Sequence, residues 1–508
     1  MKNHLRNLIS ILITVFIISL VACGDENSNE VLQITSEESN EDEESNEDEE
    51  SNEEEEEVID DTSETTYGSG LTTLKFPEII SSTNIDLTMD YGSTEFYEGH
   101  LTTTRGFNGS YLGPLLVMNK DDIMNITVNN NQSEATTVHW HGMHVPPNID
   151  GGPHVVIDAN STWQPSFTVM DEASTSWYHP HLHGNSREQV NAGLAGMIIV
   201  RDESSPIQSM LPKTLYVDEY PLILQYQAFD DSYEFSTEGG TEVAVINGTI
   251  DPILELPAQM VRFHILNADD GENFTLNLST GENIMIIGTE GGLLPTTAYV
   301  SELEITNGER YEIMLDLTAY QGQTIYLQNT APEGGGPGGG GGRLLATNAE
   351  NMITLIISEP TTSAVTTIPS SLENFPSWSE SEADITRQKI LAGPGPNWTI
   401  DGVGYDHDVN NLEIPLDNIE IWEITNNSDQ EHPFHIHDVQ FYILDIDGIA
   451  PPDYKAGRKD VVQVLAGSTV RFITQFENFT SDEFPYMYHC HILAHEASGM
   501  MGQFIVVE

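Results

Sequence analysis

The strongest constraint on this chain is residues 488–501, near the C terminus. They read Tyr-His-Cys-His-Ile-Leu-Ala-His-Glu-Ala-Ser-Gly-Met-Met, so a thiol, three imidazoles and two thioethers lie close together in the chain. A soft thiolate with histidine partners and a weak methionine is the ligand set of a blue-copper electron-transfer centre. Taken alone, the stretch fits a zinc site or a surface histidine cluster as well.

An extended backbone would let this stretch serve two sites at once. Side chains alternate along a strand, so His489 and His491 would point to one face and Cys490 to the other. One short strand could then hold Cys490 on one copper ion and its two neighbours on another copper centre.

The N terminus indicates export from the cytoplasm. Lys2 and Arg6 precede a mostly apolar run over residues 8–21, which is short for a membrane span. Residues 20–24, Leu-Val-Ala-Cys-Gly, resemble a bacterial lipobox, which implies cleavage before Cys23 and lipid attachment to its sulfur. An ordinary signal peptide with a chance cysteine is the alternative.

This interpretation predicts a lipoprotein signal peptide over residues 1–22 and a lipid anchor in the bacterial cell envelope. The anchor would lie on the periplasmic face or at the cell surface. Because the chain has two cysteines and a lipidated Cys23 forms no disulfide, Cys490 would be a lone thiol in an oxidising compartment. A bound metal would explain such a thiol.

Acidic residues dominate the charge of the chain. The formal net charge is -64, with 81 Asp and Glu against 17 Lys and Arg, so nucleic-acid binding is excluded. Residues 23–65 are a low-complexity acidic segment with an unbroken run of glutamates at 53–57. Such a segment repels itself and buries no core, so we expect a disordered tether between lipid and globule.

The rest of the chain favours an all-β fold, because glycine, proline and short strand-like runs are frequent and long amphipathic helices are absent from the pattern. We expect a first β domain over 66–203, a second over 204–360, a linker over 361–384 and a third over 385–508. The glycine-rich run at 334–342 lacks the Lys-Ser/Thr that follows in a phosphate-binding loop, so we interpret it as a flexible loop. His264 is interpreted as an ordinary strand histidine.

Four histidine motifs carry the functional information. They are His-Trp-His-Gly at 139–142, His-Pro-His-Leu-His-Gly at 179–184, His-Pro-Phe-His-Ile-His at 432–437 and the C-terminal stretch. Together they resemble the motif set of the three-domain multicopper oxidases, which include laccases, bacterial cuprous oxidases and spore-coat laccases. The resemblance covers about residues 70–508 and implies three consecutive cupredoxin-like Greek-key β-sandwiches.

The resemblance also implies a set of four copper ions and their ligands. His432, Cys490 and His495 would bind the type 1 copper, and Met500 would be its weak axial ligand. His139 and His435 would bind the type 2 copper. One type 3 copper would take His141, His179 and His491, and the other would take His181, His437 and His489. His144 and His183 match no ligand position.

Two carboxylates match acidic positions that the family places near its copper cluster. Asp150 and Glu496 could relay protons to reduced oxygen; the alternatives are an Asp-Gly-Gly turn at Asp150 and a solvated charge at Glu496. Asp460 matches a position that often orients a type 1 histidine, and a surface charge is its alternative. The predicted catalytic residues are Asp150, Glu496 and Cys490, the last as the electron link.

The implied activity is oxidation of a small reducing substrate with O2 as the electron acceptor. We expect a laccase-like enzyme acting on phenols or aromatic amines, because no methionine-rich insert is present. Oxidation of Cu(I) or Mn(II) in copper tolerance is the second hypothesis, and a copper-free envelope scaffold of the same fold is the third. Asp429, Glu431 and Asp438 could favour cationic donors or be solvated charges. We expect a monomer.

Overall fold

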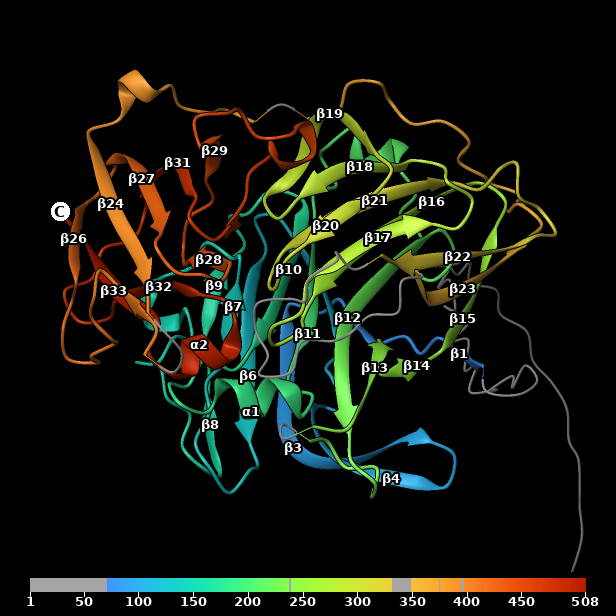
Figure 1. Ribbon diagram of the computed structural model, residues 1–508, viewed down its shortest axis with the longest axis horizontal. Coiled ribbons are helices and arrows are strands. Elements are labelled where there is room, and N and C mark those ends of the chain that lie inside the picture. Colours follow the sequence, from blue (N-terminus) through green and yellow to red (C-terminus); the bar gives the residue numbers. More distant parts are fainter. Residues whose placement is uncertain (1–70, 237–238, 331–348, 374, 394–396) are drawn as a thin grey trace, which may run out of the picture. The chain divides into compact units, whose positions relative to one another are not determined.

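The computed structural model describes residues 71–236, 239–330, 349–373, 375–393 and 397–508. The predicted signal peptide, the acidic tether and the glycine-rich run therefore lie outside the described residues. Within them the regular secondary structure is almost entirely β-strand, which confirms the all-β prediction. Figure 1 traces three successive groups of strands, from blue and teal through green and yellow to orange and red.

The first sandwich packs two sheets around a core that includes Leu87, Trp140 and Tyr178. One sheet has the order β2-β5-β11-β10-β7, and the other has the order β4-β3-β6-β8 with β9 added to β6. The strands are β2 (Ile79–Ile80), β3 (Asn84–Tyr97), β4 (His100–Phe107), β5 (Leu115–Asn119), β6 (Ile123–Asn130), β7 (His139–His141), β8 (Ser161–Trp163), β9 (Ser166–Thr168), β10 (Ser174–His179) and β11 (Gly196–Arg201).

The second sandwich has the largest apolar core, which includes Phe263, Phe274 and Ile313. Its sheets have the orders β14-β13-β12-β16-β21-β18-β19 and β1-β15-β23-β22-β17-β20. The strands are β1 (Thr72–Thr73), β12 (Glu219–Phe229), β13 (Thr241–Ile246), β14 (Thr249–Ile250), β15 (Pro252–Pro257), β16 (Met260–Asn267), β17 (Phe274–Leu278), β18 (Ile284–Thr289), β19 (Gly292–Val300), β20 (Leu303–Ile305), β21 (Arg310–Asp316), β22 (Thr324–Asn329) and β23 (Glu350–Ser358). Because β1 pairs with β15, the start of the described chain belongs to this sandwich.

The third sandwich is built around Trp422, Phe434 and Phe472. Its sheets have the orders β25-β24-β27-β31-β29 and β26-β33-β32-β28-β30. The strands are β24 (Ile385–Ala392), β25 (Thr399–Ile400), β26 (Leu412–Pro415), β27 (Ile419–Asn426), β28 (His432–Ile436), β29 (Tyr442–Ile446), β30 (Val461–Val464), β31 (Thr469–Gln475), β32 (Tyr486–Cys490) and β33 (Met501–Val507). Cys490 and Met500 are part of this core.

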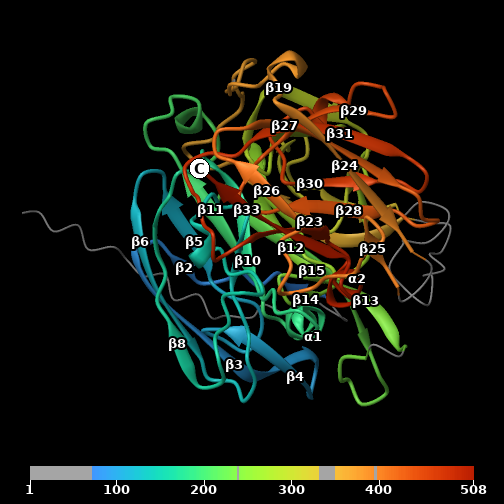
Figure 2. The same ribbon diagram turned by 90° about the vertical axis from the view of Figure 1, so that its left-hand side faces the viewer.

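Helices are few and short. Among the described residues, the two α-helices are α1 (Ser186–Asn191) and α2 (Leu493–Ala497), and the four 3-10 turns are η1 (Pro147–Ile149), η2 (Gln208–Met210), η3 (Glu380–Glu382) and η4 (Asp453–Lys455). No helix in the described part of the chain is long and apolar enough to cross a membrane. The two α-helices, one from each terminal sandwich, pack against each other in both views (Figures 1 and 2).

Candidate metal centre

The C-terminal stretch folds as β32, a turn and α2, and this places one cysteine and two histidines together. β28 lies antiparallel to β32 with Phe434 opposite Cys490. The sulfur of Cys490 is 3.4 Å from Nδ1 of His432 and 3.7 Å from Nδ1 of His495. Met500, also fully buried, accepts a backbone hydrogen bond from Cys490 through its carbonyl oxygen. We call His432, Cys490 and His495 the cysteine site.

Eight further histidines form a second group, the histidine cluster, between the first and third sandwiches. The first sandwich contributes four from β7, β10 and the turn after β10, and the third contributes four from β28, β32 and the residues that follow them. The cluster consists of His139, His141, His179, His181, His435, His437, His489 and His491, all of them buried. Nε2 of His489 lies 3.0 Å from Nε2 of His181 and 3.3 Å from Nε2 of His437, so the two sandwiches meet ring to ring.

The ring nitrogens of the cluster fall into compact sets whose members lie within 4.8 Å of one another. One set is His141, His179 and His491; another is His181, His437 and His489; a third is His139, His141 and His435. The first two sets are the trios predicted for the two type 3 ions, and the third contains both histidines predicted for the type 2 ion. Every predicted histidine ligand is therefore brought to one of the two sites.

Burial makes seven of the cluster histidines neutral. Burial, with the neighbouring rings as further causes, holds the pKa of five cluster histidines well below the usual value: His141, His179, His435, His437 and His489. It lowers the pKa of His181 and His491 to about 3. A neutral imidazole has a free lone pair, which is the form that binds metal.

Two kinds of comparison bear on this arrangement. A family model described as multicopper oxidase matches residues 88–205, and a second with the same description matches residues 380–508. The chain is 31% identical over 463 residues to the multicopper oxidase mco of Staphylococcus haemolyticus, an alignment that covers 87% of this chain and 94% of that protein. The chain belongs to the multicopper oxidase family.

Proteins that are similar to this oxidase in sequence or in structure carry several functional names. A laccase-like multicopper oxidase from Ochrobactrum superposes with a TM-score of 0.78 at 31% identity, over 85% of this chain and all of that one. A metallo-oxidase from Campylobacter jejuni superposes with a TM-score of 0.72 at 25% identity, over 85% and 96% of the two chains. The cell division protein FtsP of Sodalis glossinidius is 28% identical over 81% of this chain and 86% of that protein.

The residues of this oxidase fit the copper that its family implies. Nε2 of His139 and Nε2 of His435 are buried in the cluster without a hydrogen-bond partner, and so are both ring nitrogens of His491. Burial also raises the pKa of the Cys490 thiol, so a thiolate there needs a cation beside it. Buried lone pairs and a buried thiol that face one another are a donor set suited to copper.

Asp150 links the two halves of the histidine cluster. Its carboxylate lies 2.8 Å from Nδ1 of His437, and its backbone oxygen lies 2.9 Å from Nδ1 of His139. Each contact engages Nδ1 and so directs Nε2 of the ring toward the cluster. Asp150 does lie in a turn, as the alternative interpretation predicted, but its side chain also contacts His437 of the third sandwich.

Glu496 is a buried carboxylate beside the same cluster, and a solvated charge is therefore excluded. Its two oxygens lie 3.6 Å from Nδ1 of His181 and 3.5 Å from Nδ1 of His489. Burial raises the pKa of Glu496 to about 8, against a smaller opposing effect of the Ser186 hydroxyl. Such a carboxyl can hold a proton near neutral pH.

The prediction that Asp460 orients a type 1 histidine is wrong. Its backbone oxygen lies 2.8 Å from Nδ1 of His435, and its carboxylate lies 3.2 Å from Nε2 of His141, so both contacts are in the histidine cluster. The residue beside His432, a predicted type 1 ligand, is instead Ser428, whose hydroxyl is 2.9 Å from Nε2 of His432. A serine in a turn before β28 carries no sequence signal for this role.

Trp398 is a second residue that the sequence did not identify. Its ring centroid lies 4.9 Å from that of His432 and 4.5 Å from that of His495. It is 6% exposed and so covers the cysteine site with an apolar surface. An isolated tryptophan between Asn397 and Thr399 gives no hint of this contact.

The three acidic residues near His432 in sequence have different environments. Asp429 is exposed, whereas Glu431 is half-buried and accepts a hydrogen bond from Asn273 of the second sandwich. Asp438 is buried and pairs with Nδ1 of His144 at 2.8 Å. Of the three, Asp429 is therefore the carboxylate that a cationic donor could meet in solvent.

His264 and His183 lie outside both groups of predicted ligands. His264 is buried between Glu219 and Glu312 in the second sandwich, as its interpretation as a strand histidine predicted. His183 is exposed and packs edge-on against Tyr405, at 5.0 Å between ring centroids. Neither lies in the cysteine site or the histidine cluster.

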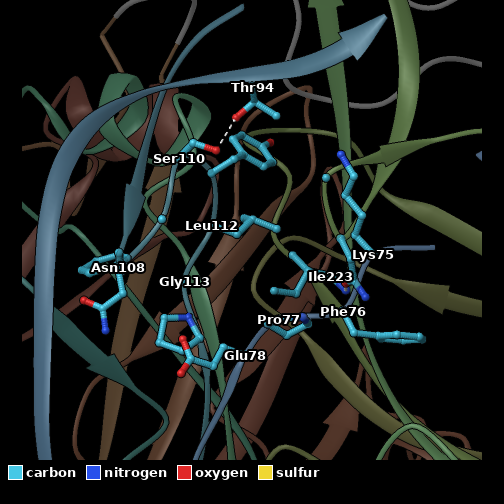
Figure 3. A pocket seen from close by; sticks show the side chains of 16 residues that line it. Lys75, Phe76, Pro77, Glu78, Thr94, Asn108, Ser110, Leu112, Gly113 and Ile223 are labelled. Carbon is cyan, nitrogen blue, oxygen red and sulfur yellow. Dashed lines mark hydrogen bonds between the residues drawn. The ribbon is translucent and has the colours of Figure 1, made fainter. Parts of the chain in front are cut away.

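Two surface hollows are lined by none of the predicted metal ligands. A pocket of about 280 Å³ between the first two sandwiches is lined by residues such as Lys75, Ser110 and Ile223, and Thr94 bonds to Ser110 at its wall (Figure 3). A groove of about 840 Å³ runs along α1 and α2, where Arg187 and Ala494 line it. No histidine or cysteine of the described chain lines either one.

Proposed function

We propose that this oxidase couples one-electron oxidation of phenols or aromatic amines to four-electron reduction of O2 to water. One observation carries the proposal. Cys490 stands in the cysteine site while its chain neighbours, His489 and His491, stand in the histidine cluster with ring centroids 5.6 Å apart. A single covalent segment thus joins a site suited to single-electron exchange with one suited to several metal ions.

The proposed ligand roles follow the sets of nitrogens described above. The cysteine site with Met500 would hold type 1 copper, and the histidine cluster would hold the type 2 and two type 3 ions. Copper in these positions would supply one-electron chemistry on the donor side and dioxygen reduction on the other. Four phenols each lose one electron and one proton, while one O2 takes up four of each to become two waters.

The chain's own part in this reaction is positioning, insulation and proton supply. The cluster rings are buried, so water reaches them only by restricted routes. Glu496 holds a proton between His181 and His489, and Asp150 lies against His437. These carboxyls are the proposed donors of the protons that oxygen consumes.

The copper content of the purified chain decides this proposal. We expect a blue protein with four copper ions per chain that consumes one O2 for every four phenol molecules oxidised. The measurements are metal analysis, visible absorption and an oxygen electrode with a dimethoxyphenol. A colourless protein, or one with a single zinc ion, would overturn the proposal.

The Ser428 hydroxyl should lower the potential of the cysteine site. Because Nδ1 of His432 faces the sulfur, Nε2 carries the hydrogen and donates it to Ser428. That bond makes the ring a stronger donor to an oxidised metal, so Ser428→Ala should raise the potential by about 40 mV for a bond of about 1 kcal/mol.

A redox titration of the blue absorption checks the Ser428 prediction. The matched control is Ser468→Ala, because Ser468 also bonds to a turn carbonyl but has no contact with the site. A potential that is unchanged in Ser428→Ala, or that rises equally in Ser468→Ala, would contradict it.

Metal-ion oxidation is the second candidate function, supported by the metallo-oxidase among the structural neighbours. Exposed Asp429 offers a carboxylate that could attract Cu(I) or Mn(II). Parallel steady-state rates on a phenol, Cu(I) and Mn(II) separate the two. A scaffold role, for which the FtsP relative is the support, predicts a chain that binds no copper.

The cell-envelope location remains a proposal that rests on the sequence. The resemblance of residues 20–24 to a lipobox supports a lipid on Cys23, with the acidic segment as a spacer. In that arrangement the oxidase would meet its donors outside the cytoplasm, as an expected monomer.

A further inference from the structure

The second sandwich contributes no ligand to the histidine cluster among the described residues, yet one of its side chains reaches it. Arg310, the first residue of β21, is fully buried. Its guanidinium donates to both carboxylate oxygens of Asp460 at 2.6 Å each. It also donates to the backbone oxygens of Thr175 and Gly308, at 3.0 Å each. A fork held at four points has little freedom to turn.

Asp460 transmits this rigidity to two rings of the cluster. Its carboxylate faces Nε2 of His141, and its backbone oxygen accepts from Nδ1 of His435. The opposite nitrogens then face inward, because Nδ1 of His141 lies 3.4 Å from Nε2 of His179 and Nε2 of His435 has no other partner. Partners that engage the outer nitrogen of a ligand ring fix the direction of the inner one.

Gly142 shows that the chain leaves room for this ion pair. Its φ is +88°, and a Cβ there would collide with Nη2 of Arg310 and lie 2.7 Å from the Asp460 carboxylate. The glycine that ends the first histidine motif is thus explained by the approach of Arg310. The first, second and third sandwiches all meet at this point.

We propose that Arg310 is a positioning residue for the histidine cluster, acting through Asp460 on His141 and His435. Without Arg310 the buried Asp460 carboxylate loses its positively charged partner. A rotation of Asp460 toward another polar partner would then misdirect the rings of His141 and His435. Copper should then be lost from the cluster and kept in the cysteine site, which Arg310 does not touch. The inference rests on the proposed ligand roles.

The test compares Arg310→Met and Arg310→Lys with a matched control in the same sandwich. Arg262 is equally buried and pairs with Glu312, but it contacts no residue of the cluster, so Arg262→Met removes a comparable ion pair. Each copper-loaded protein is titrated with a chelator, and the blue and non-blue copper signals are followed separately by electron paramagnetic resonance.

We expect Arg310→Met to release cluster copper 10- to 100-fold more readily, roughly the effect of other losses around metal ligands, with the blue signal unchanged. The copper release of Arg310→Lys should be intermediate, because lysine keeps the positive charge but lacks the planar guanidinium that donates to both Asp460 oxygens. Arg262→Met should release its copper like the wild type. Should Arg310→Met fail to fold, Arg310→Lys provides the same comparison.

The inference falls if the Arg310 variants keep their cluster copper as tightly as the wild type. It also falls if Arg262→Met loses as much, because the effect would then be general damage to the second sandwich. Wild-type protein that binds no copper would instead contradict the proposed function, and therefore this inference as well. If the wild type binds its full copper and the Arg310 variants retain it equally well, only this inference is contradicted.

Discussion

Cys490→Ser should abolish the blue absorption and reduce turnover with every donor to background, while three of the four copper ions remain. Serine keeps the shape of the side chain but offers a hard hydroxyl where the site needs a soft thiolate. The sulfur is also the atom through which the cysteine site connects to His489 and His491. The cluster rings come from backbone that the substitution leaves in place, so their copper should stay.

Metal analysis, visible absorption and oxygen uptake measure the three parts of this prediction. Met501→Leu is the matched control, because Met501 directly follows the predicted axial ligand, begins β33 and is also buried. It should stay blue and active. A Cys490→Ser protein that oxidised phenols at the full rate would refute the connection between the two sites, and one that lost all copper would make Cys490 a general structural residue.

Glu496→Gln should slow the oxygen half of the reaction by about 10²- to 10⁴-fold and leave the donor half unchanged. Glutamine fits the same buried space but has no proton to release. The residue lies between two cluster rings and carries no contact to the sulfur of Cys490, so the blue colour should persist. The enzyme should therefore accumulate in its reduced, bleached form during turnover.

Stopped-flow absorption separates the two halves. Anaerobic bleaching by a phenol should proceed at the wild-type rate, and the return of colour on mixing with O2 should be slow. Glu188→Gln, at an exposed position on α1, is the control and should behave like the wild type. Equal return of colour in Glu496→Gln would remove Glu496 from the proton supply.

The sequence alone indicated the proposed ligand set, because each proposed ligand lies in a short motif with its own signature. The spacing His-Cys-His requires one strand to face two sites, and β32 ends at Cys490 with its neighbours on the cluster side. The all-β class followed from the same kind of local evidence. Soft donors, spacing and strand alternation are properties of neighbouring residues, so no long-range contact was needed to find them.

The tertiary structure decided which residues support those ligands. Arg310 lies 150 positions from Asp460, and Ser428 contacts the ring of His432 through the turn between β27 and β28. A side chain that acts through space on a ligand leaves no periodic or spaced pattern in the chain. Asp460 illustrates the limit: its importance was visible in the sequence, but the ring that it orients depended on how the three sandwiches meet.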